Sequence, residues 1–172
     1  ETSTEGWVGG SFGIGYNRLA DFNSDALYSG YNNENSLLNT YVDFLNANGG
    51  TNPSDAFDSD PFGVGLAWET YLINPLPFDS TQYYSVITDG NVQQTKSLVT
   101  RGGINEIAIS FAGNYGNRLY LGGTIGIPNL RYANSTTYTE EDINQEHSDF
   151  EDFSLSEYSE TNGLGINAKF GL

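Results

Sequence analysis

The stretch INEIAISFAGNYGNRLYLGGTIGI, residues 104–127, decides the fold of this chain. Large apolar residues occupy every second position of its first arm, and small or weakly polar residues fill the positions between them. The second arm repeats the pattern after a tight polar turn at residues 116–118. Strict alternation over about ten residues per arm, joined by a very short turn, is typical of two tilted transmembrane β-strands. The stretch therefore predicts an antiparallel hairpin that crosses a membrane.

Alternation also predicts what each face of the hairpin meets. If Tyr115 faces Leu119, then Phe111 faces Gly123, and a bulky aromatic ring beside a cross-strand glycine protects the bare backbone. The side chains predicted to face lipid are Ile107, Ile109, Phe111, Leu121, Ile125 and Ile127. Those predicted to line the interior of a barrel are Ala108, Ser110, Ala112, Gly122, Thr124 and Gly126. The alternative is a soluble β-sandwich with one buried face, whose wet face would usually carry Lys, Glu and Thr.

Composition narrows the class of protein further. The 172 residues are enough for one domain with a core, and we predict a single domain over residues 1–172. The absence of Cys excludes disulfides and thiolate metal sites, and no apolar run is long enough for a transmembrane helix. A formal charge of −16 disfavours nucleic acid as a partner. Because the chain starts at Glu1 without Met, we expect it to be a segment of a longer protein.

The charges are concentrated in two stretches. No Lys or Arg occurs between Arg18 and Lys96, where ten acids fall, or between Arg131 and Lys169, where nine acids fall. The central hairpin has almost no charge. Neutral strands joined by long acidic loops fit a barrel whose loops face the cell exterior, although acidic surface loops also serve solubility.

Four spanning strands are predicted, and they fit an all-β fold with helical loop insertions. The strands are residues 6–16, 92–115, 119–138 and 153–172; the loops are an external insertion with short helices at 19–91 and an acidic external loop at 139–152. Four strands cannot close, because the smallest bacterial barrel has eight and lipid does not tolerate an open sheet edge. We therefore expect an antiparallel transmembrane β-barrel segment, part of a larger barrel.

The long insertion contains one clear helical pattern. Apolar residues recur at four-residue intervals over residues 36–48, and Ser36 or Asn35 can cap the start of that helix. Residues 62–73 fit either a strand or a short helix. Strand parity favours a helix or an irregular segment, because a further crossing would need another strand between residues 75 and 91.

Four stretches carry a resemblance to a known family: LYSGYNNENSLLNTYVDFL (27–45), LAWETYLINP (66–75), TRGGINEIAISFAGNYGNRLYLGGTIGIPNLRY (100–132) and TNGLGINAKFGL (161–172). They resemble the outer-membrane transport family that includes the FadL long-chain fatty-acid transporters and the toluene transporters. The resemblance implies a fourteen-stranded monomeric barrel plugged by an N-terminal hatch. Such a barrel captures hydrophobic molecules at its external loops and releases them sideways into the membrane. The hatch and most of the strands of that family have no counterpart in this sequence.

No catalytic pattern is present. The sequence has no metalloprotease motif, no phosphate-binding loop and only one histidine, His147, so we expect neither an enzyme nor a cofactor. The acidic residues 55, 58 and 60, or 140–142, could supply oxygen ligands to Ca²⁺, but a solvated acidic loop is the simpler interpretation.

Ligand binding is better motivated, because the insertion holds an apolar helical region outside the strands. The candidate ligand-binding residues are Leu37, Leu38, Tyr41, Val42, Leu45, Trp68, Tyr71 and Leu72, with Arg101 as a counter-charge for a carboxylate. These side chains could equally pack the two loop segments together, and the two roles are compatible.

These observations predict passive transport of hydrophobic small molecules through the outer membrane of a Gram-negative cell. The expected partners are the hydrophobic small molecule, outer-membrane lipid and lipopolysaccharide. The alternative function is that of a soluble or surface-exposed acidic β-sandwich that acts in binding or adhesion.

Overall fold

The structure, a computed structural model, describes residues 5–172 and divides them into two compact units. Within the described residues, unit 1 comprises residues 5–26, 98–136 and 157–172, and unit 2 comprises residues 27–97 and 137–156. This division differs from the single domain predicted over residues 1–172. Every side chain of the buried core lies in unit 2.

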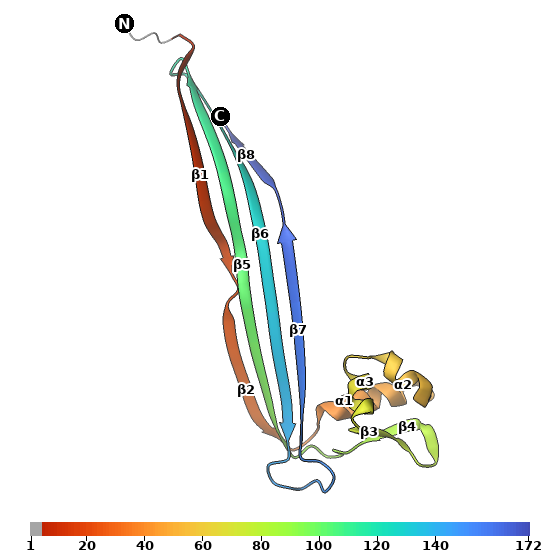
Figure 1. Cartoon of the computed structure of the whole chain (residues 1–172). Coiled ribbons are helices and arrows are strands. Elements are labelled where there is room, and N and C mark those ends of the chain that lie inside the picture. Colours follow the sequence, from red (N-terminus) through yellow and green to blue (C-terminus); the bar gives the residue numbers. More distant parts are fainter. Residues whose placement is uncertain (1–4) are drawn as a thin grey trace. The chain divides into compact units, whose positions relative to one another are not determined.

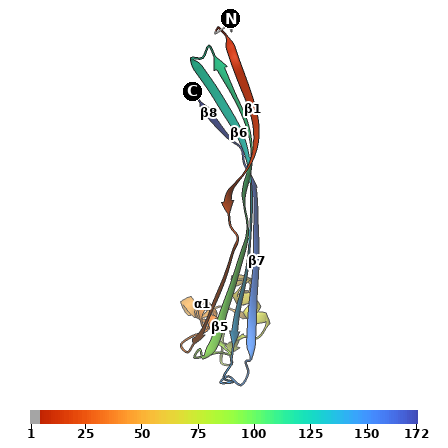
Figure 2. The same cartoon turned by 90° about the vertical axis from the view of Figure 1, so that its left-hand side faces the viewer.

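Unit 1 is built from strands and tight connections, and its described residues include no helix. Its strands belong to a sheet of antiparallel order β1-β5-β6-β7, with β2 paired to β5 and β8 paired to β6 (Figure 1). Most of β2 and one end each of β5, β6 and β7 fall within the residues of unit 2. The bounds are Trp7–Asp21 for β1, Ser24–Asn32 for β2, Val92–Tyr115 for β5, Leu119–Glu141 for β6, Asp152–Leu164 for β7 and Asn167–Gly171 for β8. The views in Figures 1 and 2 show the strands of unit 1 as one twisted layer.

The predicted hairpin forms, and its turn lies at residues 116–118, where the Arg118 N–H donates to the Tyr115 carbonyl at 3.1 Å. Contacts across the pair agree with the predicted register. The Phe111 ring lies 3.5 Å from the point where a Cβ on Gly123 would stand. The hydroxyls of Ser110 and Thr124, which the same register places opposite each other, are 2.8 Å apart.

Two loop boundaries differ from the prediction. The insertion expected from residue 19 starts later, because β1 continues to Asp21 and β2 then runs to Asn32. The acidic loop expected at 139–152 is shorter, because β6 continues to Glu141 and β7 begins at Asp152. The sequence of these extensions is too polar to alternate clearly. Backbone pairing along the long strand β5 nevertheless holds β2 in the sheet.

Unit 2 contains the helices and a separate hairpin. Its elements are α1 (Leu37–Asn46), a 3₁₀ turn (Ala47–Gly49), α2 (Pro53–Ser59), α3 (Val64–Glu69), β3 (Ile73–Leu76) and β4 (Asp79–Ser85). The helix predicted within residues 36–48 is confirmed, and so is the preference for a helix within 62–73. The β3–β4 hairpin was not predicted. No helix in the described part of the chain is long and apolar enough to cross a bilayer.

The core of unit 2 is small but closely packed. Its buried side chains are Leu38, Leu45, Ala56, Val64, Ala67, Ile73, Tyr83, Ile87, Val92 and Phe150. Helix α1 supplies Leu38 and Leu45, both fully buried, and the ring of Trp68 packs edge-on against Tyr83 with centroids 5.6 Å apart. The apolar residues whose spacing predicted α1 therefore form the face of the helix that packs against the rest of unit 2.

A buried carboxylate fixes the start of α1. Glu140, at the end of β6, is fully buried and accepts hydrogen bonds from four donors. These are the Ser36 hydroxyl, the Leu37 N–H at 2.8 Å, the Gln94 amide at 2.9 Å and the Tyr138 hydroxyl at 2.5 Å. Burial, followed by the bond to Glu140, raises the pKa of Tyr138, which keeps this hydroxyl protonated as a donor. An anion beside the N-terminus of a helix is also favoured by the helix dipole.

Replacing Glu140→Ala should loosen α1, because one buried and three half-buried donors lose their shared acceptor. A buried donor left without a partner costs about 1–3 kcal/mol. We expect faster hydrogen exchange of the α1 amides, measured by mass spectrometry. Glu141→Ala is the matched control, since Glu141 is the exposed next residue. Equal exchange in the two variants would show that the carboxylate does not hold the helix.

Candidate functional site

One face of the unit 1 sheet carries large apolar side chains in register. Pairing of β1 with β5 sets Phe12 beside Phe111, Ile14 beside Ile109 and Tyr16 beside Ile107. Pairing of β6 with β8 sets Phe170 beside Gly123 and Ala168 beside Ile125. These side chains have little protein cover: 68% of Phe12 and 86% of Phe170 are exposed. We call this surface the apolar face of unit 1.

The opposite face is lined by small and polar side chains. Gly13 pairs with Ser110, and Thr124 pairs with Lys169, so one row of this face runs across four strands without a large apolar group. Glu106 lies further along β5 on the same face, beyond Ala108; it is 4% exposed and accepts from the Asn167 amide at 2.6 Å. The two charged residues in this part of the sheet, Glu106 and Lys169, therefore lie on the small, polar face.

The apolar face has defined ends. At one end, beside the tight turn, the rings of Trp7 and Tyr115 meet edge to face with centroids 5.6 Å apart. At the other end, Arg18 of β1 pairs with Asn105 of β5. Three ion pairs lie at this residue pair or beyond it: Arg18–Asp21 at 2.9 Å, Arg101–Asp25 at 2.6 Å and Arg131–Glu160 at 3.3 Å. The interval between the ends, residues 7–16 of β1, matches the about 9–11 residues with which a tilted strand crosses a bilayer.

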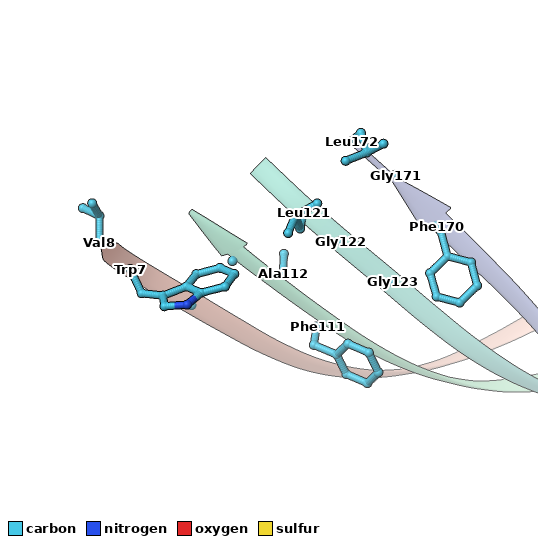
Figure 3. A pocket seen from close by; sticks show the side chains of 13 residues that line it. Trp7, Val8, Phe111, Ala112, Leu121, Gly122, Gly123, Phe170, Gly171 and Leu172 are labelled. Atoms are coloured by element: carbon cyan, nitrogen blue, oxygen red, sulfur yellow. The ribbon is translucent and has the colours of Figure 1, made fainter. Parts of the chain in front are cut away.

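Glycines leave an open hollow of about 800 Å³ in the sheet near the tight turn (Figure 3). Trp7, Phe111 and Phe170 border it, and Gly122 and Gly123 are among its lining residues. The close approach of Trp7 requires the glycine at 113, because a Cβ there would collide with the indole ring. Aromatic rings thus shield the backbone of these glycines, which is a recurring device in exposed sheets.

Unit 2 contains a second concave feature, an open groove of about 440 Å³ between α1, the α3 region and the first residues of β7. We call it the unit 2 groove. Its apolar lining is Leu38, Leu66, Ala67, Leu72, Phe153 and Leu155. A volume of this size is in the range of small-molecule sites, which are mostly apolar with few polar groups.

The polar groups of the unit 2 groove are mainly acceptors and hydroxyls. Asp152, the exposed first residue of β7, lies on its lining. Gly63 lies between Tyr41 and Asp60: a Cβ there would collide with the Asp60 carboxylate and stand 3.2 Å from the Tyr41 hydroxyl. The Thr70 hydroxyl donates to the Leu66 carbonyl at 2.8 Å, so its proton is engaged in a hydrogen bond at the C-terminal end of α3.

The structure separates the predicted ligand-binding residues into three groups. Leu38, Tyr41 and Leu72 line the unit 2 groove. Leu45 belongs to the buried core, and Val42 and Trp68 pack against it. Leu37 begins α1, where its N–H binds Glu140. Two candidates lie elsewhere: Tyr71 is 76% exposed with a positive φ, and Arg101 lies in unit 1 with its guanidinium bound to Asp25.

Sequence reasoning missed the contribution of β7 to the groove. Phe153 and Leu155 alternate with polar residues and were read only as the start of a strand. Their alternation shows that they share a face, but nothing in the sequence says that α1 and α3 lie against that face. Among residues 5–172, the acidic residues considered for Ca²⁺ do not form a group of three that could hold a metal ion.

Comparison with family models, curated proteins and solved structures finds no match to this chain. The features that bear on function are therefore the apolar face of unit 1 and the groove of unit 2.

Two leucines should separate core packing from groove lining. Leu45→Ala removes a fully buried side chain and should cost about 2–5 kcal/mol of unfolding free energy. Leu66→Ala removes a side chain that is 45% exposed and should change stability by less than about 1 kcal/mol. Chemical unfolding followed by Trp68 fluorescence, with Trp7 replaced by Phe, measures both. A Leu66 variant as unstable as the Leu45 variant would make the groove part of the core.

Proposed function

We propose that unit 1 is a membrane-spanning part of an outer-membrane β-barrel that transports hydrophobic small molecules passively. The observation that carries this proposal is the registered apolar face, four strands wide, whose opposite face holds Glu106 and Lys169. Monomeric soluble proteins rarely leave a contiguous apolar patch of more than a few hundred Å² in water. Lipid provides the cover that an apolar outer face needs, and a barrel interior accepts the small, polar face.

The sheet edges support a larger barrel. Among residues 5–172, strand β1 pairs with β5 alone, and on the other side β7 and β8 pair with β6 alone, so each edge of the described sheet has unpaired backbone groups. Hydrocarbon cannot satisfy such groups, and neighbouring strands must do so. A barrel of fourteen strands, which the family resemblance implies, supplies these neighbours.

The unit 2 groove supports a role in ligand capture. It combines an apolar lining with a volume suited to a small molecule, and it lies in a unit rich in helices and loops. Loops positioned by a rigid scaffold commonly carry binding function. We assign no chemical step to the protein, and we take transport to run down the gradient of a hydrophobic compound, with outer-membrane lipid and lipopolysaccharide around the barrel.

Arginine placed on either face of β5 tests the membrane assignment. Ile109→Arg puts a charge in the middle of the apolar face and should cost roughly 2–4 kcal/mol near the bilayer midplane. Ser110→Arg, one residue along, puts the same charge on the polar face and should cost much less. Unfolding by urea in phospholipid vesicles, followed by gel mobility of unheated samples, compares the two. Equal costs at both positions would favour the soluble β-sandwich.

Substitutions in the unit 2 groove test transport. Leu66→Ser and Phe153→Ser make the groove polar and should reduce uptake of a neutral aromatic hydrocarbon by cells that carry the full-length protein, by several-fold. Phe44→Ser is the matched control, because Phe44 is a 53% exposed aromatic on α1 outside the groove lining. Unchanged uptake in the groove variants, with normal amounts of folded barrel in the membrane, would refute the assignment of the groove.

A further inference from the structure

The charge of this protein is divided unequally between its units. Unit 2 holds 15 of the 22 acidic residues, and its only lysine or arginine is Lys96. The arginine–carboxylate pairs Arg18–Asp21, Arg101–Asp25 and Arg131–Glu160 lie in unit 1. Most of the net charge of −16 is therefore carried by the unit that contains the groove.

Neither the lysine nor the histidine of unit 2 is part of the groove. Lys96 lines a different hollow, beside Tyr31 and Tyr138. His147 is mostly buried, with its Nε2 hydrogen-bonded to the Gly90 carbonyl at 2.8 Å. Asp152 is the acidic residue of the groove lining, and the Asp60 carboxylate lies behind Gly63 without being part of that lining. Among the described residues, the lining contains no guanidinium or ammonium group.

We propose that the unit 2 groove selects amphiphiles that have an aromatic or alkyl body and a positively charged amine head over those with a carboxylate head. This inference rests on the proposed function and deepens it, because it names the ligand class for the same groove. The apolar body contacts Leu38, Leu66 and Phe153, and the ammonium head lies toward Asp152 and Asp60.

Electrostatics give this selection its direction. An ammonium near Asp152 gains Coulomb attraction, and a carboxylate in the same place meets repulsion with no cation to offset it. A cleft lined by one sign of charge also raises the local concentration of oppositely charged ligands and their association rate. Because the groove is open to solvent, each contribution is modest and is screened by salt. An alcohol of the same shape, which has no charge, measures the apolar contribution alone.

The test uses three probes of one shape: 4-phenylbutylamine, 4-phenylbutanol and 4-phenylbutyrate. Their dissociation constants are measured by calorimetry with the full chain in a non-ionic detergent. We expect the amine to bind about threefold to tenfold more tightly than the alcohol, and the butyrate to bind most weakly. The advantage of the amine should shrink between low and high sodium chloride concentration, and the affinity of the alcohol should stay constant.

Two substitutions locate the effect. Asp152→Asn and Asp60→Asn should each reduce amine affinity by about threefold and leave alcohol affinity unchanged. Asp43→Asn removes the same charge from an exposed position on α1 outside the groove lining and should change amine affinity less. Because Asp60 lies against Gly63, Asp152→Asn at the exposed start of β7 is the variant that keeps the test independent of folding.

The outcomes separate this inference from the proposed function. If the alcohol binds, Leu66→Ser weakens it, and the amine binds no better than the butyrate, the groove is a hydrophobic site without charge selection and this inference is wrong. If none of the three probes binds, the groove is not a ligand site and the proposed capture role fails as well. Equal losses of amine affinity in the Asp152 and Asp43 variants would also overturn the inference, because the effect would then be one of net charge.

Discussion

A β-strand places successive side chains on opposite faces of its sheet, and unit 1 depends on this two-residue period. Because the four neighbouring strands keep a common register, the period produces one apolar face and one small, polar face. Unit 1 has no helix among its described residues and no member of the buried core, so its apolar face is covered by nothing within the unit. A one-residue slip of a strand would move its large side chains to the wrong face, which explains why the register must be held so closely.

Unit 2 differs from unit 1 because it buries its apolar side chains in a core of its own. Buried apolar side chains from the helices, the β3–β4 hairpin, the start of β5 and two loop positions, Ile87 and Phe150, pack together, and Glu140 anchors the start of α1. The same helix has two roles: Leu45 stabilises the core, and Tyr41 lines the groove. A small, rigidly packed unit that presents an apolar groove within an acidic surface can bind a ligand without losing much conformational entropy.

Sequence alone predicted the parts of the fold that depend on local periodicity. The tight turn, the bounds of β5 and the helix that begins after Ser36 follow from spacing within one segment. Other features depend on partners far along the chain, so no local sequence pattern predicts them. These are the extension of β1, the strand β2, the β3–β4 hairpin and the place of Phe153 in the groove lining. Of the candidate ligand residues, Leu38 and Tyr41 were correctly placed beside the α3 region. Leu45 belongs to the core instead, and Trp68 packs against that core. The spacing of apolar residues on a helix cannot separate a core role from a place in the groove lining.

The central claim is that the apolar face of unit 1 contacts lipid. The chain has no native cysteine, so single cysteines introduced at each position from Ile107 to Ala112 can be labelled with a nitroxide without background. If this face contacts lipid, collision with oxygen, which concentrates in lipid, should alternate with a period of two in vesicles that hold the full-length protein, and it should peak at Ile107, Ile109 and Phe111. Higher accessibility of those same three positions to a water-soluble nickel complex than to oxygen would contradict it.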